Sequence, residues 1–402
     1  MVEDHRMHPL TRPSRSWLIL VLTLAVGSSA SCAPDPEVSA AAEAPAAPPA
    51  RGLPLQRLKL PPGFTIDVWA SDVPNARSLA MSSSGIVFVG SREGDKVTAL
   101  RDADGDGHAE QRRVVASGLK TPNGVAFREG SLYVAEIPRI LRFDSIDRIF
   151  EAGFTLPAPV IVNDKYPSEG WHGWKFIAFG PDGLLYVPVG APCNTCEPVE
   201  PFASLTRLKP DGTAREIVAR GIRNTVGFDW HPVTKELWFT DNGADDMGDE
   251  VPNCELNRVR EKGLHFGFPY CHQGDVLDPE YGTGKTCASY EPPAWKMGPH
   301  HAPLGMRFYT GSMFPQRYRN AALIAEHGSW NRSKPAGYRV TAVFLDASGT
   351  KAVSAEPLVE GFLADDGKAW GRPVDVLMLP DGSLLISDDR AEAIYRLSSS
   401  AP

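Results

Sequence analysis

Short apolar segments separated by polar, glycine-rich turns recur through most of the chain. Each unit begins at a polar or proline-containing corner, runs into an apolar segment, turns, and enters a second one. Residues 77–81, a turn at Ser84-Gly85, and residues 86–89 form the first unit. Six units begin at residues 77, 122, 172, 223, 301 and 372. β-Branched and aromatic residues are frequent in these segments, which predicts strands.

The length of the units predicts the fold class. The first four units start 45 to 51 residues apart, and several continue into a third strand, at residues 97–100, 140–143, 205–208 and 394–397. Four strands in a repeat of about 40–50 residues are typical of propeller blades. We predict an all-β, six-bladed β-propeller over residues 54–402, with a strand at 64–69 added to the last blade to close the ring. The alternative is two β-sandwiches.

The N-terminus has the pattern of an export signal. Arg12 and Arg15 precede an apolar run at residues 17–26, and small residues follow at 27–31. This predicts a signal peptide over residues 1–31, and therefore an exported protein, periplasmic or membrane-tethered. An N-terminal anchor helix is the alternative. Residues 32–53 are rich in Ala and Pro, which predicts an extended tether.

Cys32 follows Ser29-Ala30-Ser31, which resembles a bacterial lipobox with Ser29 where an aliphatic residue is usual. Lipidation of Cys32 and simple cleavage near Ala30 both remain open. Export also permits disulfides. Connectivity does not follow from sequence alone; our prediction pairs Cys193 with Cys196 and Cys271 with Cys287, leaving Cys254.

The amino-acid composition agrees with a fold of short strands and turns, and the net charge bears on which partners the protein could bind. The 37 Gly and 36 Pro residues match a chain of short elements and frequent turns. The net charge is −8 and the chain has no basic block, so nucleic acid is not an expected partner.

Three units begin with residues suited to chemistry, namely His172, Arg223 and Arg372. In a propeller the starts of the innermost strands converge on a central pocket, so these side chains should meet. Two guanidiniums suit a polyanionic ligand. A histidine beside them suits general-base chemistry, although a lone histidine is more often structural.

The motifs along the repeats resemble the quinoprotein glucose/sorbosone dehydrogenases, six-bladed propellers that bind pyrroloquinoline quinone (PQQ) and calcium. The resemblance covers roughly residues 54–399. Its best segments are residues 172–183, Gly221-Ile-Arg-Asn224, 241–250, His265-Phe-Gly-Phe-Pro269, His327-Gly-Ser-Trp-Asn-Arg332 and Gly371-Arg-Pro373.

The resemblance implies roles for single residues. His172 would take the proton of the substrate hydroxyl, and Arg223 would polarise the quinone carbonyl that accepts the hydride. The backbone carbonyls of Gly243 and Ala244 would bind the calcium. The other implied cofactor-binding residues are Asn224, Asn242, Asp249 and Arg372, with Arg332 and Lys334 as two candidates for an expected lysine.

Two positions depart from the family pattern. An Asp that orients the base histidine is replaced by Ala191, and a second arginine is replaced by Val374. The predicted function is oxidation of an aldose or sugar aldehyde, with a quinone or cytochrome as the unknown electron acceptor. The alternatives are a non-catalytic binding propeller with a degenerate cofactor site and a calcium-dependent sugar lactonase.

A second calcium pattern lies early in the chain. Asp102, Asp104 and Asp106 alternate with small residues, as in the first half of a calcium-binding loop. An EF-hand would need Glu at the twelfth position, where Arg113 stands, and helices rather than strands on either side. We predict a structural calcium site in an outer loop of the first blade, with an unliganded Asp/Gly turn as the alternative.

Overall fold

A computed structural model describes residues 52–400, which belong to one compact unit. The predicted signal peptide, nearly all of the tether and the Cys32 anchor lie outside the described residues, so they stay predictions. None of the helices within residues 52–400 has the length and apolar character needed to cross a membrane.

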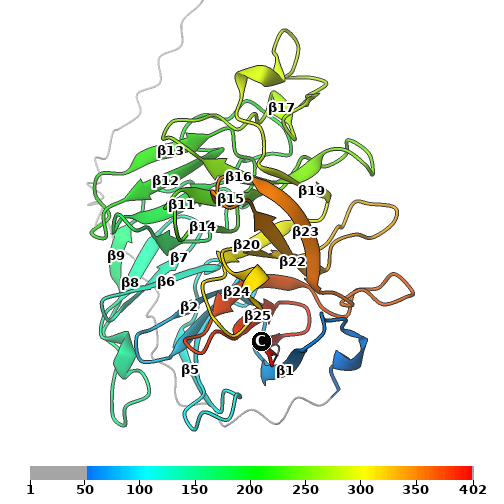
Figure 1. Cartoon of the computed structure of the whole chain (residues 1–402). Coiled ribbons are helices and arrows are strands. Elements are labelled where there is room, and N and C mark those ends of the chain that lie inside the picture. Colours follow the sequence, from blue (N-terminus) through cyan, green and yellow to red (C-terminus); the bar gives the residue numbers. More distant parts are fainter. Residues whose placement is uncertain (1–51, 401–402) are drawn as a thin grey trace, which may run out of the picture. The chain divides into compact units, whose positions relative to one another are not determined.

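Six four-stranded antiparallel sheets make up the fold, and each is one blade (Figure 1). Blades one and two are β2–β5 (Ala76–Met81, Val87–Ser91, Val97–Arg101, Gln111–Ala116) and β6–β9 (Gly124–Arg128, Ser131–Ala135, Ile140–Phe143, Val160–Asn163). Blades three and four are β10–β13 (Ala178–Phe179, Leu185–Val189, Ser204–Leu208, Glu216–Arg220) and β14, β15, β16 and β19 (Phe228–Trp230, Leu237–Asp241, Asn253–Val259, Trp295–Pro299). Blades five and six are β20–β23 (Pro303–Phe308, Ala322–Glu326, Arg339–Leu345, Ala352–Val359) and β24, β25, β26 and β1 (Pro373–Met378, Leu384–Asp388, Ala393–Ser399, Phe64–Ala70).

The first and last parts of the propeller close the ring together. Strand β1 pairs antiparallel with β26, from Phe64 opposite Ser399 to Ala70 opposite Ile394. The innermost strand of blade one, β2, contacts the innermost strands of blades two and six, β6 and β24. The six-bladed propeller is therefore confirmed, and so is the predicted closing strand. The two-sandwich alternative is wrong.

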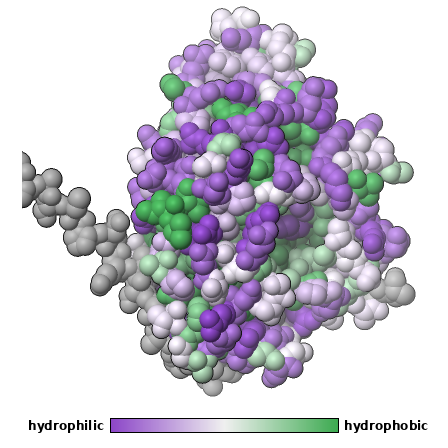
Figure 2. Space-filling view, turned by 90° about the vertical axis from the view of Figure 1, so that its left-hand side faces the viewer, coloured by the Kyte–Doolittle hydropathy of each residue, from purple (hydrophilic) through white to green (hydrophobic). Residues whose placement is uncertain are grey.

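Apolar side chains pack between neighbouring blades rather than in one central core. One cluster joins blades one and two through residues such as Phe88, Val134 and Phe143. Another joins blades three and four through Phe176, Phe228 and Phe239. Polar residues predominate on the face shown in Figure 2, where apolar side chains gather in separate patches. Because the apolar side chains pack between the blades, the polar residues that precede or follow the innermost strands lie at the centre of the ring.

The innermost strands of blades three and four begin later than the sequence pattern predicts. Strands were expected from residues 172 and 223, but β10 begins at Ala178 and β14 at Phe228. The reason in blade four is that the Asp241 carboxylate accepts the backbone N–H groups of Arg223 and Asn224, which are thus not available to a strand ladder. In blade three, His172 has a positive φ of 49°, which a strand does not allow.

The longest insertion lies between β16 and β19 in blade four. It contains a small hairpin, β17 (Cys271–His272) with β18 (Val276–Leu277), drawn at the top of Figure 1. A disulfide between Cys271 and Cys287 holds this insertion, and a second joins Cys193 to Cys196. Cys254 is a free, buried thiol. The predicted pairing is confirmed for the five cysteines of residues 52–400.

Candidate functional site

A cavity of about 370 Å³ opens at the centre of the ring, where the innermost strands begin. The structure brings six of the predicted site residues to its wall. They are His172, Arg223, Asn224, Asn242, Gly243 and Arg372. They come from loops of blades three, four and six, so the expected convergence of the strand starts is observed.

His172 sits in the wall as a buried, neutral imidazole. Its Nδ1 lies 2.9 Å from the backbone carbonyl oxygen of Ala191, and its Nε2 accepts a hydrogen bond of 3.1 Å from the indole N–H of Trp171. Nδ1 therefore carries the proton, and the lone pair on Nε2 is the basic site. Burial, with the charge of Arg223 second, lowers the pKa of His172 to about 3.

The structure resolves the question raised by Ala191. Ala191 stands where the family resemblance leads us to expect an orienting carboxylate, and the backbone carbonyl of Ala191 accepts the Nδ1 proton. Orientation of the ring therefore needs no side chain at this position, and a substitution to Ala is compatible with an oriented base.

Arg223 is buried and tightly held. Its Nε donates to the Asn194 carbonyl oxygen at 2.9 Å, and Nη2 donates to Asn194 Oδ1 at 2.8 Å and to Asp245 Oδ2 at 2.9 Å. Nη1 donates to the Asn242 carbonyl oxygen at 3.3 Å. A guanidinium carries five N–H groups. Within residues 52–400, one N–H on Nη1 is left for a ligand in the cavity.

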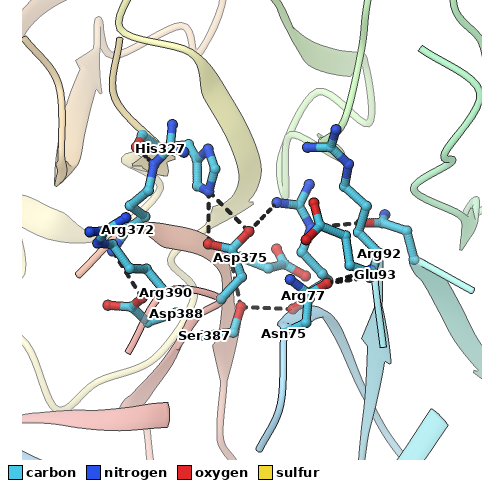
Figure 3. Close-up of polar contacts among 12 residues, drawn as sticks. Asn75, Arg77, Arg92, Glu93, His327, Arg372, Asp375, Ser387, Asp388 and Arg390 are labelled. Carbon is cyan, nitrogen blue, oxygen red and sulfur yellow. Dashed lines mark hydrogen bonds and ion pairs between the residues drawn. The ribbon is translucent and has the colours of Figure 1, made fainter. Parts of the chain in front are cut away.

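The opposite part of the wall holds a second arginine network (Figure 3). Arg77 Nη1 donates to Asp389 Oδ2 at 2.8 Å, and its Nε donates to Asn123 Oδ1 at 2.9 Å. His327 Nε2 lies 2.9 Å from the other oxygen of Asp389. His327 and Arg77 outweigh the effect of burial and hold the pKa of Asp389 below its usual range.

Several polar groups of the cavity lack partners among residues 52–400. The guanidinium of Arg92 has no hydrogen bond or salt bridge there (Figure 3). It lies over the Trp174 ring, 4.0 Å from the ring centroid. Arg372 donates to the carbonyl oxygens of His327 and Gly328 and forms no salt bridge in this part of the chain. The Asn224 Oδ1 and Trp174 Nε1 atoms are buried and unpaired. Two guanidiniums without a salt bridge among residues 52–400 fit a ligand with several carboxylates, such as PQQ.

The turn at residues 242–244 offers oxygen atoms to a cation. The carbonyl groups of Gly243 and Ala244 accept none of the hydrogen bonds found within residues 52–400. Gly243 lines both the main cavity and an adjoining pocket of about 20 Å³, and Ala244 lines the pocket alone. Unpaired carbonyl oxygens suit a hard cation such as calcium.

Three predicted cofactor residues do not line the cavity. Asp249 accepts hydrogen bonds from the backbone and hydroxyl of Ser333, and Arg332 pairs with Glu250. Lys334 is exposed. The contacts of Asp249 and Arg332 join the loop at residues 249–250 to the loop at residues 332–333. A cofactor contact from any of them stays a prediction.

The predicted second calcium loop lies between β4 and β5, in an outer loop of blade one. One oxygen from each of Asp102, Asp104 and Asp106 lies within 4.8 Å of the others. These carboxylates also accept backbone N–H groups of their own loop. The geometry is therefore compatible with both the calcium site and the plain turn, and calcium binding here stays a prediction.

The model of the Glucose / Sorbosone dehydrogenase family matches residues 158–396, which is more than half of the chain. The chain belongs to this family. A relative of 30% identity, an uncharacterized protein of Borreliella burgdorferi, aligns over 349 residues and covers 85% of this chain and 90% of its own. Family membership makes the protein an oxidoreductase of the sugar dehydrogenase type.

Solved structures at lower identity share the fold. One is a calcium structure of carbohydrate-active enzyme family AA12 from Trichoderma reesei, with a TM-score of 0.74 and 18% identity, covering 85% of this chain and 97% of that one. Another is the holo form of the PQQ domain of a pyranose dehydrogenase from Coprinopsis cinerea, with a TM-score of 0.72 and 19% identity, covering 87% and 98%. At this level of identity, the similarity to these structures shows a shared propeller fold.

Sequence reasoning missed several residues of the wall. Arg77 begins the first repeat, the position that Arg223 and Arg372 hold in theirs, so its place in the repeat was an available signal. Asn194 and Arg92 lie in loops of no recognisable pattern. Asp245 lies in the resembling segment 241–250 and was given no role, although it pairs with Arg223.

Proposed function

We propose that the protein is a PQQ- and calcium-dependent dehydrogenase that oxidises an aldose or a sugar aldehyde and passes the electrons to an external quinone or cytochrome. The observation that carries the proposal is the wall of the cavity, which places a neutral histidine beside a clamped arginine and two arginines without carboxylate partners. The N-terminal signal pattern supports a periplasmic or lipid-anchored enzyme.

The binding residues have separate tasks. Arg92 and Arg372 would pair with carboxylates of the cofactor, and Asn224 would bind its edge through the unpaired Oδ1. Gly243 and Ala244 would hold the calcium through their carbonyl oxygens. PQQ, when bound, supplies a quinone that takes up the hydride from the sugar carbon.

His172 would take the hydroxyl proton at Nε2. The hydrogen bond from Nδ1 to the Ala191 carbonyl fixes the tautomer that leaves this lone pair free. The low pKa leaves Nε2 unprotonated over the whole physiological range. Before this step, the substrate hydroxyl must displace the Trp171 indole from Nε2.

Arg223 would stabilise the negative charge that develops on the accepting carbonyl. Its unclaimed Nη1 N–H is a preorganised donor in a buried site, where such an interaction is strong. The charge of Arg223 also contributes to the low pKa of His172.

The test is reconstitution with PQQ and Ca²⁺, followed by assays on a panel of aldoses and sugar aldehydes with an artificial acceptor. His172→Gln should lower kcat by about 10²–10⁴-fold. PQQ binding measured by calorimetry should persist in that variant, because the carboxylate-binding arginines are unchanged. His108→Gln, in the outer loop of blade one, is the matched control and should keep full activity. Absence of both PQQ binding and turnover in the wild type would show the proposal to be wrong.

A further inference from the structure

One loop contacts both of the proposed catalytic groups. Residues 191–196 lie in the connection between β11 and β12, the second and third strands of blade three. The backbone N–H of Ala191 donates to the Arg223 carbonyl oxygen at 2.8 Å, and its carbonyl oxygen lies 2.9 Å from His172 Nδ1. The backbone of a single residue thus ties the two segments that carry His172 and Arg223.

Asn194 in the same loop holds the guanidinium itself. Its carbonyl oxygen and its Oδ1 accept hydrogen bonds from Arg223 Nε and Nη2, at 2.9 and 2.8 Å. Oδ1 also accepts the backbone N–H of Asp245 at 2.8 Å, and Nδ2 donates to the Asp245 carbonyl oxygen at 3.0 Å. Asn194 therefore fixes both the arginine and the residue whose carboxylate pairs with it.

A disulfide closes around this asparagine. Cys193 and Cys196 are three positions apart, so Asn194 lies inside a four-residue ring. A disulfide stabilises a fold by restricting the unfolded chain, and this effect grows with the size of the loop. The Cys271–Cys287 bridge, with a separation of 16, has the larger effect of this kind. The main consequence of the small ring is local, because it limits the conformations open to Asn194.

We propose that Asn194, held in the Cys193–Cys196 ring, is the positioning residue of Arg223. It occupies two of the five guanidinium N–H groups, and together with Asp245 and Asn242 it leaves one Nη1 N–H without a partner among residues 52–400. The catalytic consequence rests on the proposed function, whereas the clamp on the arginine is a property of the folded chain and can be tested without turnover.

The first experiment observes the Arg223 side chain by NMR in the unliganded protein labelled with ¹⁵N-arginine. The Nε–H signal, assigned by its loss in Arg223→Lys, should be protected from solvent exchange in the wild type because it donates to Asn194. Protection should fall at least tenfold in Cys193→Ser/Cys196→Ser. Cys271→Ser/Cys287→Ser is the matched control and should lower Tm while leaving the Arg223 signal protected.

The second experiment separates positioning from a merely structural role. Asn194→Ala removes Oδ1 and Nδ2, and should lower kcat of the reconstituted enzyme about tenfold or more with a smaller change in KM, because a displaced Arg223 loses most in the transition state. Asn194→Asp keeps the Oδ1 acceptor and should recover part of the rate. Asn163→Ala, which loses an asparagine bond in blade two, should lower stability without this kcat effect.

The outcomes distinguish the two proposals. If turnover is absent but protection of the Arg223 Nε–H depends on the disulfide ring, then Asn194 positions Arg223 and the proposed function is wrong. The positioning role of Asn194 is overturned if the Arg223 Nε–H exchanges freely in the wild type. It is also overturned if Asn194→Ala lowers Tm but leaves kcat unchanged, and both results hold for any substrate.

Discussion

The two sides of the cavity each combine a buried arginine, an aspartate and a histidine, but they are built from different parts of the fold. On one side, which we call the Arg77 wall (Arg77, Asp389, His327 and Arg372), Arg77 lies on β2 and Asp389 directly follows β25. On the other side, the Arg223 wall (Arg223, His172, Asn194 and Asp245), the partners of the arginine come from loops. Residues on or next to strands thus position the side chains of the Arg77 wall, whereas residues in loops position Arg223 in the other wall.

We infer from this difference that the Arg77 wall mainly stabilises the fold and that the Arg223 wall carries the chemistry. The Arg77–Asp389 pair joins residues 312 positions apart and links the first blade to the last, so it supports closure of the ring. His327 is held at Nε2 by Asp389 and has no lone pair to offer there. His172 instead keeps a lone pair at Nε2, which accepts a hydrogen bond from the exposed indole of Trp171. The loop-built wall is therefore the side that we expect to react.

The largest expected effect comes from removing one carboxylate charge on each side. Asp389→Asn leaves Arg77, which is 1% exposed, without its counter-charge and should lower the free energy of unfolding by about 3–5 kcal/mol. Asp245→Asn should cost about 1–3 kcal/mol, because Arg223 keeps its three bonds to Asn194 and Asn242. Urea unfolding of both variants measures the difference.

Activity should rank the same two variants in the opposite order. At a temperature where both are folded, Asp245→Asn should lose more kcat than Asp389→Asn, because Asp245 fixes the proposed catalytic arginine. If both variants lose the same free energy of unfolding, or if Asp389→Asn loses more kcat, then the Arg77 wall does not mainly serve stability and the Arg223 wall does not mainly serve catalysis.

The sequence predicted the blades well because each depends on local patterning. Apolar segments of four to six residues with Gly and Asp turns set the strands, and the repeat set their number. The closing strand was predictable for the same reason. The start of β14 was not, because the side chain of Asp241, a residue of the next strand, accepts the backbone N–H groups at 223 and 224. The start of β10 was not, because the positive φ of His172 carries no signal in the sequence.

Site residues that begin a repeat were predictable, as His172, Arg223 and Arg372 were and as Arg77 could have been, whereas the loop residue Asn194 was missed. His172, Arg223 and Arg372 occupy equivalent positions, so topology alone brings them together. Asn194 reaches Arg223 across 29 residues through a disulfide loop, and no spacing rule encodes that contact. The orienting carbonyl of Ala191 was also invisible, because backbone groups carry no signal in the identity of the residue.

The pH dependence of stability gives a sharper contrast between the walls. Near the Arg223 wall, burial and the charge of Asp241 raise the pKa of Glu255 to about 8. The native state then retains a proton that the unfolded state releases above its ordinary pKa, so stability falls as pH rises toward 8, by at most about 1.4 kcal/mol per pH unit. The low pKa of Asp389 adds no slope in this range, because its contribution is lost only at acid pH.

Glu255→Gln isolates this effect, since glutamine resembles the protonated acid. The variant should gain stability over the wild type as pH rises from 6.5 to 8. Histidine titration in this window is common to both proteins and cancels in the difference between their curves. Glu261→Gln, an exposed position, is the matched control and should follow the wild-type curve. Thermal unfolding at four pH values is the measurement, and parallel curves for Glu255→Gln and wild type would contradict the raised pKa.

The smallest expected effect concerns the indole that covers the base. Trp171 donates to His172 Nε2 while its side chain is 54% exposed, so substrate binding must break one neutral hydrogen bond. Trp171→Phe keeps an aromatic ring and removes the donor, and KM should fall about 2- to 10-fold with kcat nearly unchanged. Trp330→Phe, at the exposed rim of the same cavity, leaves the Trp171 bond in place and should not lower KM. If both variants raise KM, the tryptophans bind the sugar rather than cover the base, and the reactive side of the cavity is reached without displacing Trp171.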